Sequence, residues 1–173
     1  MDEEIMPAQK FYENQPWSDG QLGYLAGIID GEGCIRIDRT KAGKTCKRPY
    51  IFFLLLTVSN TDSLLCQYLK QTYEGYTYPL YHNKYNEKHS TCWEWRITGY
   101  RAAALLKLVY PYLRVKKQQA EIAMEFQEKR KKPRGSYHKL GIHGGFPMSS
   151  EEYSRQAEDY LLLRSLKRGG RVL

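Results

Sequence analysis

The chain lacks the features that mark secreted, membrane-spanning and zinc-binding proteins. None of its four cysteines forms a CxxC pair, which argues against a zinc site; they are Cys34, Cys46, Cys66 and Cys92. The first ten residues are acidic and polar and contain no apolar segment of the kind found in secretory signals. The longest apolar stretch, residues 51–58, is too short to cross a bilayer. We therefore expect an intracellular protein with four free thiols, neither secreted nor bound to a membrane.

Positive charge is in excess. The 173 residues include 27 lysines and arginines against 19 aspartates and glutamates, a formal net charge of +8. This balance favours a polyanionic partner, nucleic acid before an anionic membrane, although a basic protein without such a partner stays an alternative. The hydrophobic share of 42% indicates a globular chain. The length suits one domain and is too short for two copies of it.

Hydrophobic periodicity predicts an alternation of helices and strands. Strands are expected at residues 34–40, 50–58, 76–82 and 91–98, and helices at 21–30, from 60–62 onward, and at 98–109, 115–132 and 149–167. Two antiparallel hairpins would form one four-stranded sheet with helices on one face, an α+β layer in the order αββαββα. We expect an N-terminal leader 1–17, a main domain 18–132, a glycine- and proline-rich linker or loop 133–148, and a C-terminal helical extension 149–173. There is no internal repeat.

Local signals support these elements. Ser18-Asp19 and Asn60-Thr61-Asp62 provide helix N-caps, and residues 149–152 form a capping box. Period-two alternation gives each strand a core face and a polar face, with Ile35 and Ile37 opposed to Arg36, Asp38 and Thr40, and Trp93, Trp95 and Ile97 opposed to Glu94, Arg96 and Thr98. On the apolar strand 50–58 we assign Phe52, Leu54 and Leu56 to the core and Ile51, Phe53, Leu55 and Thr57 to the other face. A single bulge would invert that assignment.

Residues 25–33 read Leu-Ala-Gly-Ile-Ile-Asp-Gly-Glu-Gly at the end of the first expected helix. This stretch resembles the LAGLIDADG motif of homing endonucleases, with Glu32 at the position of the usual catalytic aspartate. The expected element order is also that of the family, and residues 110–120 resemble the segment after the second hairpin in single-motif members. The resemblance covers about residues 18–130 and implies the LAGLIDADG endonuclease fold, with a four-stranded DNA-binding sheet. Glutamate in place of aspartate adds one methylene to the reach of the acid.

Three glycines recur every four residues in the first helix, at Gly23, Gly27 and Gly31, so they share one helix face. Such a face is useful where another backbone must approach closely, although glycines packed against the chain's own sheet are the alternative. The resemblance implies that the partner is the same helix of a second copy. Because this chain has one motif, we expect a homodimer about a two-fold axis. Its interface would contain Gly23, Tyr24, Gly27, Ile28 and Gly31.

Glu32 follows the helix C-terminus, where unpaired carbonyls add negative potential. A carboxylate beside backbone oxygens suits a hard cation such as Mg²⁺ or Mn²⁺, and a solvated helix-end acid is the alternative. The resemblance implies that the Glu32 carboxylate and the Gly31 carbonyl bind Mg²⁺ for phosphodiester hydrolysis, with Mn²⁺ or Ca²⁺ as substitutes in binding. Asp30 aligns with the structural acid of the motif.

Two further catalytic residues are implied by the resemblance. Asn60 falls where the family places a polar side chain near the attacking water, although a simple helix N-cap explains it equally well. Lys116 aligns with a lysine that stabilises charge at the scissile phosphate, with Lys117 as the alternative register. Leu64 stands where the family has an arginine, so that contribution has no counterpart here.

A sheet with one polar, basic face can lie along a major groove and read base edges with alternate side chains. We expect the DNA-binding side chains on the hairpins and their turns: Arg36, Asp38, Thr40, Lys41, Lys44, Lys47, Arg48, Thr57, Tyr81, Asn83, Lys84, Glu94 and Arg96. Arginine suits guanine and aspartate suits cytosine, whereas the lysines would meet phosphates. For each lysine, a solvated surface charge is the alternative.

Together these observations predict a homodimeric endonuclease that cuts both strands of a long, roughly palindromic double-stranded DNA site. It would act where the host genome lies, in a bacterial or phage-infected cytoplasm or an organelle matrix. A non-cleaving relative stays open, either a maturase that binds intron RNA or a DNA-binding regulator. A purely structural oligomerisation domain is the alternative from another class, and it would show no salt-dependent affinity for DNA.

Overall fold

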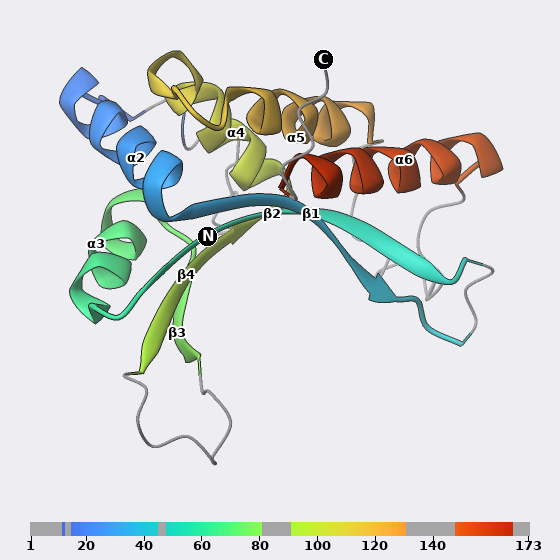
Figure 1. The fold of residues 1–173 in the computed structure, drawn as a ribbon, viewed down its shortest axis with the longest axis horizontal. Helices are drawn as coiled ribbons and strands as arrows, with labels where there is room; N and C mark the ends of the chain where they lie inside the picture. The colour runs from blue at the N-terminus through green and yellow to red at the C-terminus, as the bar shows by residue number, and fades with distance from the viewer. Residues whose placement is uncertain (1–11, 13–14, 45–47, 81–90, 131–147, 168–173) are drawn as a thin grey trace, which may run out of the picture.

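The chain folds as one four-stranded antiparallel sheet with helices on one side. The structure, a computed structural model, describes residues 12, 15–44, 48–80, 91–130 and 148–167 (Figure 1). The elements are α2 (Asp19–Glu32), β1 (Gly33–Lys41), β2 (Tyr50–Asn60), α3 (Ser63–Tyr73), β3 (Tyr76–Leu80), β4 (Cys92–Thr98), α4 (Gly99–Val109), the short 3-10 helix η1 (Tyr110–Tyr112), α5 (Lys117–Lys129) and α6 (Ser150–Lys167). This order confirms the expected α+β fold. Within the described ranges, no helix is long and apolar enough to span a membrane.

The sheet has the strand order β1-β2-β4-β3, so β1 and β3 form its edges. Figure 1 shows it as an arch, with α2, α4, α5 and α6 over the convex side and the two hairpins descending from its ends. The β1–β2 register runs without interruption from Gly33 opposite Val58 to Lys41 opposite Tyr50. No bulge therefore inverts the described part of β2, and the predicted division of its side chains between the two faces is confirmed.

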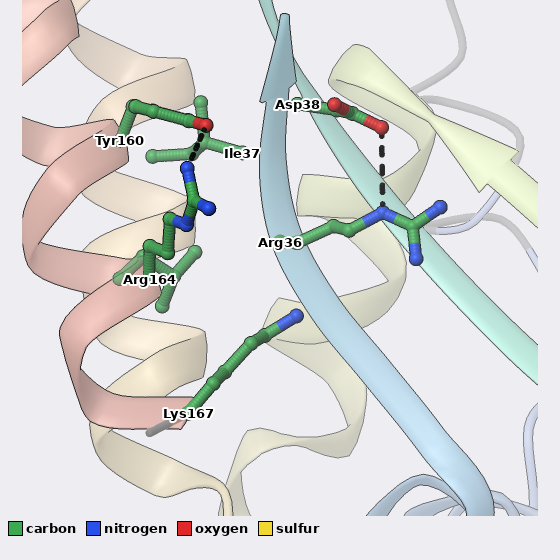
Figure 2. A pocket seen from close by; sticks show the side chains of 7 residues that line it. Arg36, Ile37, Asp38, Tyr160, Arg164 and Lys167 are labelled. Carbon is green, nitrogen blue, oxygen red and sulfur yellow. Dashed lines mark hydrogen bonds and ion pairs between the residues drawn. The ribbon is translucent and has the colours of Figure 1, made fainter. Parts of the chain in front are cut away.

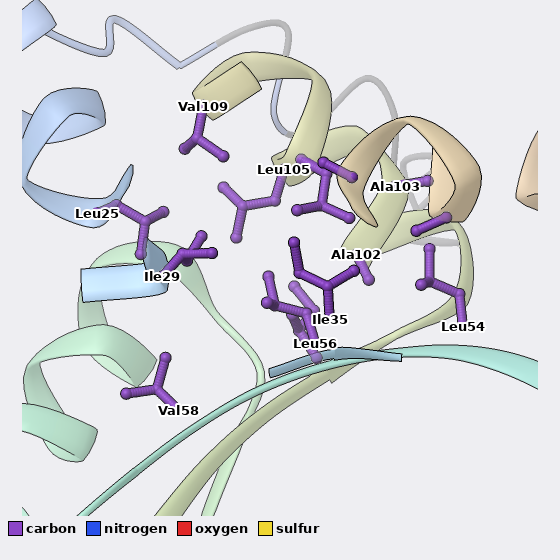
Figure 3. Packing of buried hydrophobic residues seen from close by; sticks show 14 of the residues in the cluster. Leu25, Ile29, Ile35, Leu54, Leu56, Val58, Ala102, Ala103, Leu105 and Val109 are labelled. Atoms are coloured by element: carbon purple, nitrogen blue, oxygen red, sulfur yellow. The ribbon is translucent and has the colours of Figure 1, made fainter. Parts of the chain in front are cut away.

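The core lies between the convex face of the sheet and the helices. Ile35, Leu54, Leu56 and Val58 from the sheet meet Leu25, Ile29, Leu105 and Val109 from α2 and α4, all at most 1% exposed (Figure 3). Burying one such aliphatic side chain contributes about 1.5–3 kcal/mol. The alternation of β1 and the apolar stripe of α4 are therefore enough to place the helices on this face.

The helix starts follow capping chemistry. Ser18 caps α2 in a reciprocal box with Gln21, as expected from Ser18-Asp19. Ser149 accepts the Glu152 N–H at 3.1 Å before α6. At α3 the cap is Asp62, whose Oδ1 accepts the Leu64 N–H at 2.8 Å, so the suggestion that Asn60 is the N-cap is wrong.

The described parts of the leader and of the C-terminal extension pack on the same core. Tyr12 is 1% exposed and donates its hydroxyl to the Tyr73 carbonyl at 2.9 Å, while Trp17 stacks on the Tyr73 ring with centroids 5.3 Å apart. From α6, Leu163 is buried and Tyr160 packs on Phe52 of β2. The division into leader, domain, linker and extension stays a prediction, and residues 133–147 of the linker lie outside the described residues.

Candidate functional site

The junction between α2 and β1 exposes an acid. Glu32 is the last residue of α2 and is exposed, and β1 begins at the next residue. The Gly33 N–H donates to the carbonyls of Ile28 and Ile29. A Cβ on Gly33 would lie 2.6 Å from the Ile29 Cα, so a glycine is required for the strand to leave the helix this closely. Glu32 is thereby held at a tight and compact corner.

Asp30 ties this corner to the segment before α5. Its carboxylate accepts the backbone N–H groups of Arg114 at 2.7 Å and Lys116 at 2.9 Å. Hydrogen bonds from backbone N–H groups to a carboxylate are charge-assisted and hold both segments in place. This geometry agrees with the structural role that the sequence suggested for Asp30.

Lys116 lies on the C-terminus of α2. Its Nζ donates to the carbonyls of Ile29 at 2.8 Å and Asp30 at 2.7 Å, where a positive charge complements the helix dipole. Burial lowers the pKa of Lys116, and the nearby Asp30 charge opposes that shift. The Lys117 ammonium instead lies 5.2 Å from the centre of the Tyr110 ring. The structure thus brings Lys116, and not Lys117, to the acidic corner.

Asn60 has a local structural contact. It ends β2, two residues beyond Val58, the strand partner of Gly33, and so lies at the same end of the sheet as Glu32. Its Oδ1 accepts the Asp62 N–H at 2.8 Å, an Asx turn that leads the chain into α3. Leu64, in the first turn of α3, is 69% exposed. The catalytic assignment of Asn60 stays a prediction.

The outer face of α2 is open. Among the described residues, apart from the adjoining backbone of α2 itself, no atom lies within 4 Å of a Cβ built on Gly27 or Gly31. Tyr24 on the same face is 53% exposed and packs edge-to-face on Tyr68 of α3. The alternative that these two glycines pack on the chain's own sheet is therefore wrong. Gly23 is different, because its Cβ would lie 3.9 Å from Tyr112.

Two arginines on the concave face of the sheet are already held by acids. On β1, Arg36 pairs with Asp38 at 3.5 Å. On β4, Arg96 pairs with Glu94 at 2.8 Å and its guanidinium lies 5.1 Å from the Tyr78 ring centre. Burial and the hydrogen bond that Tyr78 donates to Glu94 raise the pKa of Tyr78 to about 12. Both guanidinium groups are thus oriented before any ligand binds.

Thr57 and Glu94 lie on the concave face, as expected, but they are covered. In the chain without DNA, Thr57 is 1% exposed and Glu94 6% exposed. Thr57 is flanked by Cys34 and Arg96 on the neighbouring strands, which accounts for its burial. Direct DNA contact by these two residues stays a prediction. Glu94 supports Arg96.

The remaining predicted DNA contacts are spread along the first hairpin. Thr40, Lys41 and Lys44 are exposed, and Arg48 donates to the Met148 sulfur at 3.1 Å. Lys47, Tyr81, Asn83 and Lys84 lie outside the described residues. The apolar surface expected on β2 is reduced to Ile51, which is 44% exposed, and the half-buried Phe53, because Leu55 is buried.

The sequence did not indicate a contact between the C-terminal helix α6 and the start of β1. The Lys167 Nζ at the end of α6 lies 2.7 Å from the Cys34 Sγ, and the Arg36 Nη1 lies 3.5 Å from the same sulfur. Burial opposes ionisation of this thiol, but the hydrogen bonds and charges of Lys167 and Arg36 lower the pKa of Cys34 overall. The only signal in the sequence was that Cys34 lies two residues before Arg36, so both side chains point to the same face of the strand. Cys34, Cys66 and Cys92 are free thiols, and Cys46 lies outside the described residues.

A single copy of the chain supplies few ligands for a metal. Among the described residues, no three His, Cys, Asp or Glu side chains gather where they could hold an ion. Glu32 is the exposed carboxylate at the corner, whereas Asp30 is engaged by two N–H groups. The donors here, a carboxylate and helix-end carbonyls, are the hard oxygen ligands that Mg²⁺ takes together with water and substrate phosphates. These residues fit such an ion if a second copy or a nucleic acid completes its coordination.

Comparison with solved structures finds the same fold in homing endonucleases. The archaeal intron-encoded homing endonuclease I-Vdi141I, complexed with DNA, superposes with a TM-score of 0.61 and 13% identity over 85% of this chain and 84% of its own. I-CvuI in complex with DNA gives a TM-score of 0.52 and 20% identity over 63% of this chain, which spans 66% of that protein. The meganuclease I-SmaMI, bound to DNA, gives 0.57 and 11% over 87% of this chain, but only 45% of its own. No family model and no curated protein matches the sequence. The chain therefore has the LAGLIDADG homing endonuclease fold.

Proposed function

We propose that this chain is a homodimeric, divalent-metal-dependent homing endonuclease of the LAGLIDADG family, which cleaves both strands of a long, roughly palindromic DNA site. The observation that carries the proposal is the exposed Glu32 at the end of the open glycine face of α2, beside Lys116. The shared fold supports it, because I-Vdi141I and I-CvuI are homing endonucleases in complex with DNA.

The open face of α2 supports a second copy as the partner. Gly27 and Gly31 leave room for a close backbone, and Tyr24, Gly23 and Ile28 would border the contact. The chain matches 45% of I-SmaMI, so two copies are comparable in size to that one longer protein. A two-fold axis beside the glycine face of α2 would bring two Glu32 carboxylates together, and like charges at close range favour a bound cation between them.

The proposed chemistry uses the α2–β1 corner. The Glu32 carboxylate and the Gly31 carbonyl would hold Mg²⁺, which when bound supplies positive charge for the phosphate and lowers the pKa of a water. I-CvuI was crystallised with DNA in the presence of Mg²⁺ and of Ca²⁺. Lys116, fixed by two carbonyls of α2, adds positive charge where the phosphate would bind. Asn60 would orient water at the same end of the sheet.

The concave face would read the duplex. Arg36 and Arg96 are oriented by Asp38 and Glu94, which reduces the conformational entropy lost when they bind base edges in the major groove. Lys41 and Lys44 at the end of the first hairpin would contact phosphates. This division predicts sequence readout from the strands and salt-dependent affinity from the turn.

The test compares Glu32→Gln with the wild-type protein on a randomised plasmid library, with Mg²⁺ or with EDTA. We expect the wild-type protein to linearise plasmids only with Mg²⁺, and the variant to bind DNA without cutting, because the amide removes a negative ligand. Glu151→Gln, an exposed acid in the first turn of α6, is the matched control and should cut normally.

Other outcomes identify the alternatives. Cutting by Glu32→Gln would show that another group is the essential acid. Salt-dependent binding without cleavage by the wild-type protein would indicate a regulator or an intron maturase, which RNA binding would then separate. The absence of salt-dependent binding would indicate an oligomerisation domain.

A further inference from the structure

Helix α6 lies outside residues 18–130, the part of the chain that resembles the family, but its C-terminal end lies near the proposed active centre at Glu32. α6 packs along the edge strand β1, with Leu163 in the core and Tyr160 on Phe52. Its last described residue, Lys167, points at β1 in Figure 2 and ends 2.7 Å from the Cys34 Sγ. Cys34 lies two residues beyond Glu32. The C-terminal end of α6 is therefore beside the corner that carries the proposed chemistry.

Three cations converge at this point. Arg36 lies 3.5 Å from the Cys34 Sγ, on the concave side of β1. In addition to burial, the positive charge of Lys167 lowers the pKa of Lys116, so these two ammonium groups are close enough to repel each other. A cysteine sulfur accepts hydrogen bonds only weakly, so it does not replace an oxygen acceptor for these cations. Lys116 is balanced by two carbonyls of α2 and Arg36 by Asp38, so Lys167, whose described partner is the Cys34 sulfur, is the cation best placed to take an anion.

A cleft between β1 and α6 offers space for an anion. It has a volume of about 200 Å³ and is lined by Arg36, Ile37, Asp38, Tyr160, Leu163, Arg164 and Lys167. Its cations come from both walls, Arg36 from β1 and Arg164 and Lys167 from α6. The Arg164 guanidinium is held by a 2.9 Å hydrogen bond to the Tyr160 hydroxyl (Figure 2). The acid of the cleft, Asp38, is paired with Arg36.

We propose that the β1–α6 cleft binds one backbone phosphodiester of a DNA duplex lying on the concave face, with Lys167 as its principal contact. This assignment rests on the proposed function, because it assumes that the duplex follows β1. It makes α6 part of the DNA-binding machinery. A phosphate at this place would lie next to the α2–β1 corner, so the contact would help to set the position of the duplex over Glu32.

The test is a salt titration of binding to a 30-base-pair duplex of arbitrary sequence, followed by fluorescence anisotropy. Each phosphate contact contributes a slope of about 0.9 to the fall of log affinity with log salt. Because the proposed homodimer presents two such clefts to one duplex, Lys167→Met removes two contacts, and raising salt fourfold should weaken wild-type binding roughly twelvefold more than it weakens binding of the variant. Lys167→Arg, which keeps the charge, should restore the wild-type slope.

Two control variants separate the effect of the Lys167 charge from the effect of losing the Lys167–Cys34 contact. Cys34→Ala breaks the same Lys167 contact without removing a cation, so it should retain the wild-type slope. Lys107→Met removes a cation that pairs with Glu128 on the helical side and should also retain it. A wild-type slope in Lys167→Met, or an equal loss of slope in Cys34→Ala, would overturn the assignment of Lys167 alone. Failure of the wild-type protein to bind the duplex would overturn the proposed function together with this inference.

Discussion

The Gly27→Leu substitution should stabilise the protein if this face of α2 is free, and should destabilise the dimer if the face is an interface. Gly27 is exposed in the middle of α2, and among the described residues, apart from the adjoining backbone of α2 itself, no atom lies within 4 Å of its added Cβ. In an isolated chain, leucine should therefore stabilise the helix by about 0.8 kcal/mol, because glycine has the poorer helix propensity. For a chain of this size, that corresponds to a rise in melting temperature of about 2 °C.

The proposed dimer reverses that expectation. Where two helix backbones approach closely, each added side chain overpacks the contact at a cost of about 1–3 kcal/mol, and two-fold symmetry doubles it. The dissociation constant of the dimer should then rise by more than about tenfold. Sedimentation velocity over a range of concentrations measures this directly, and thermal unfolding measures the accompanying change in stability.

A matched control adds leucine elsewhere. Ser154→Leu places an exposed leucine on α6, which lies at the opposite side of the molecule from α2 in Figure 1, and should leave association unchanged. If Gly27→Leu has wild-type association and a higher melting temperature, α2 faces solvent in the functional protein. The paired-carboxylate arrangement would then have no structural basis.

Two further predictions concern stability. Gly33→Ala should lower the free energy of unfolding by roughly 1–3 kcal/mol, because its Cβ would meet the Ile29 backbone at 2.6 Å; urea unfolding should show no such loss for Gly43→Ala, whose Cβ meets no described atom within 4 Å. The Tyr78–Glu94 hydrogen bond should stabilise the fold fully below the unfolded tyrosine pKa of about 10 and be lost as pH rises toward 12, because folding raises the pKa of Tyr78 to about 12. Urea unfolding across this range should show a shallower decline in Tyr78→Phe, and an unchanged decline would refute the assignment.

The sequence predicted those elements whose signals are local. Ser18 and Gln21 lie within one turn, so the cap of α2 could be read directly. Alternation placed Ile35 and Leu56 on the same face because a strand has a fixed period of two. Three adjacent capping residues, in contrast, left the start of α3 ambiguous, and only the hydrogen bond to Leu64 identifies Asp62.

What could not be predicted depends on neighbours that are distant in sequence. The alternation of side chains along a strand correctly predicted that Thr57 and Glu94 lie on the concave face, but their burial comes from side chains on adjacent strands. The contact between Cys34 and Lys167 joins residues 133 positions apart. No local pattern encodes such a contact, because it depends on how α6 packs against β1.

No linker separates Glu32 from β1, so the distance from this acid to each side chain along the strand is fixed. With a strand rise of about 3.3 Å per residue, Arg36 lies at most about 13 Å beyond Glu32, close to four base-pair steps of B-form DNA. For a duplex that follows β1, the offset between the cut and the first base read from this strand is therefore fixed by covalent geometry. In the proposed endonuclease, exchanging side chains further along the strand would change which bases are recognised without shifting the site of cleavage.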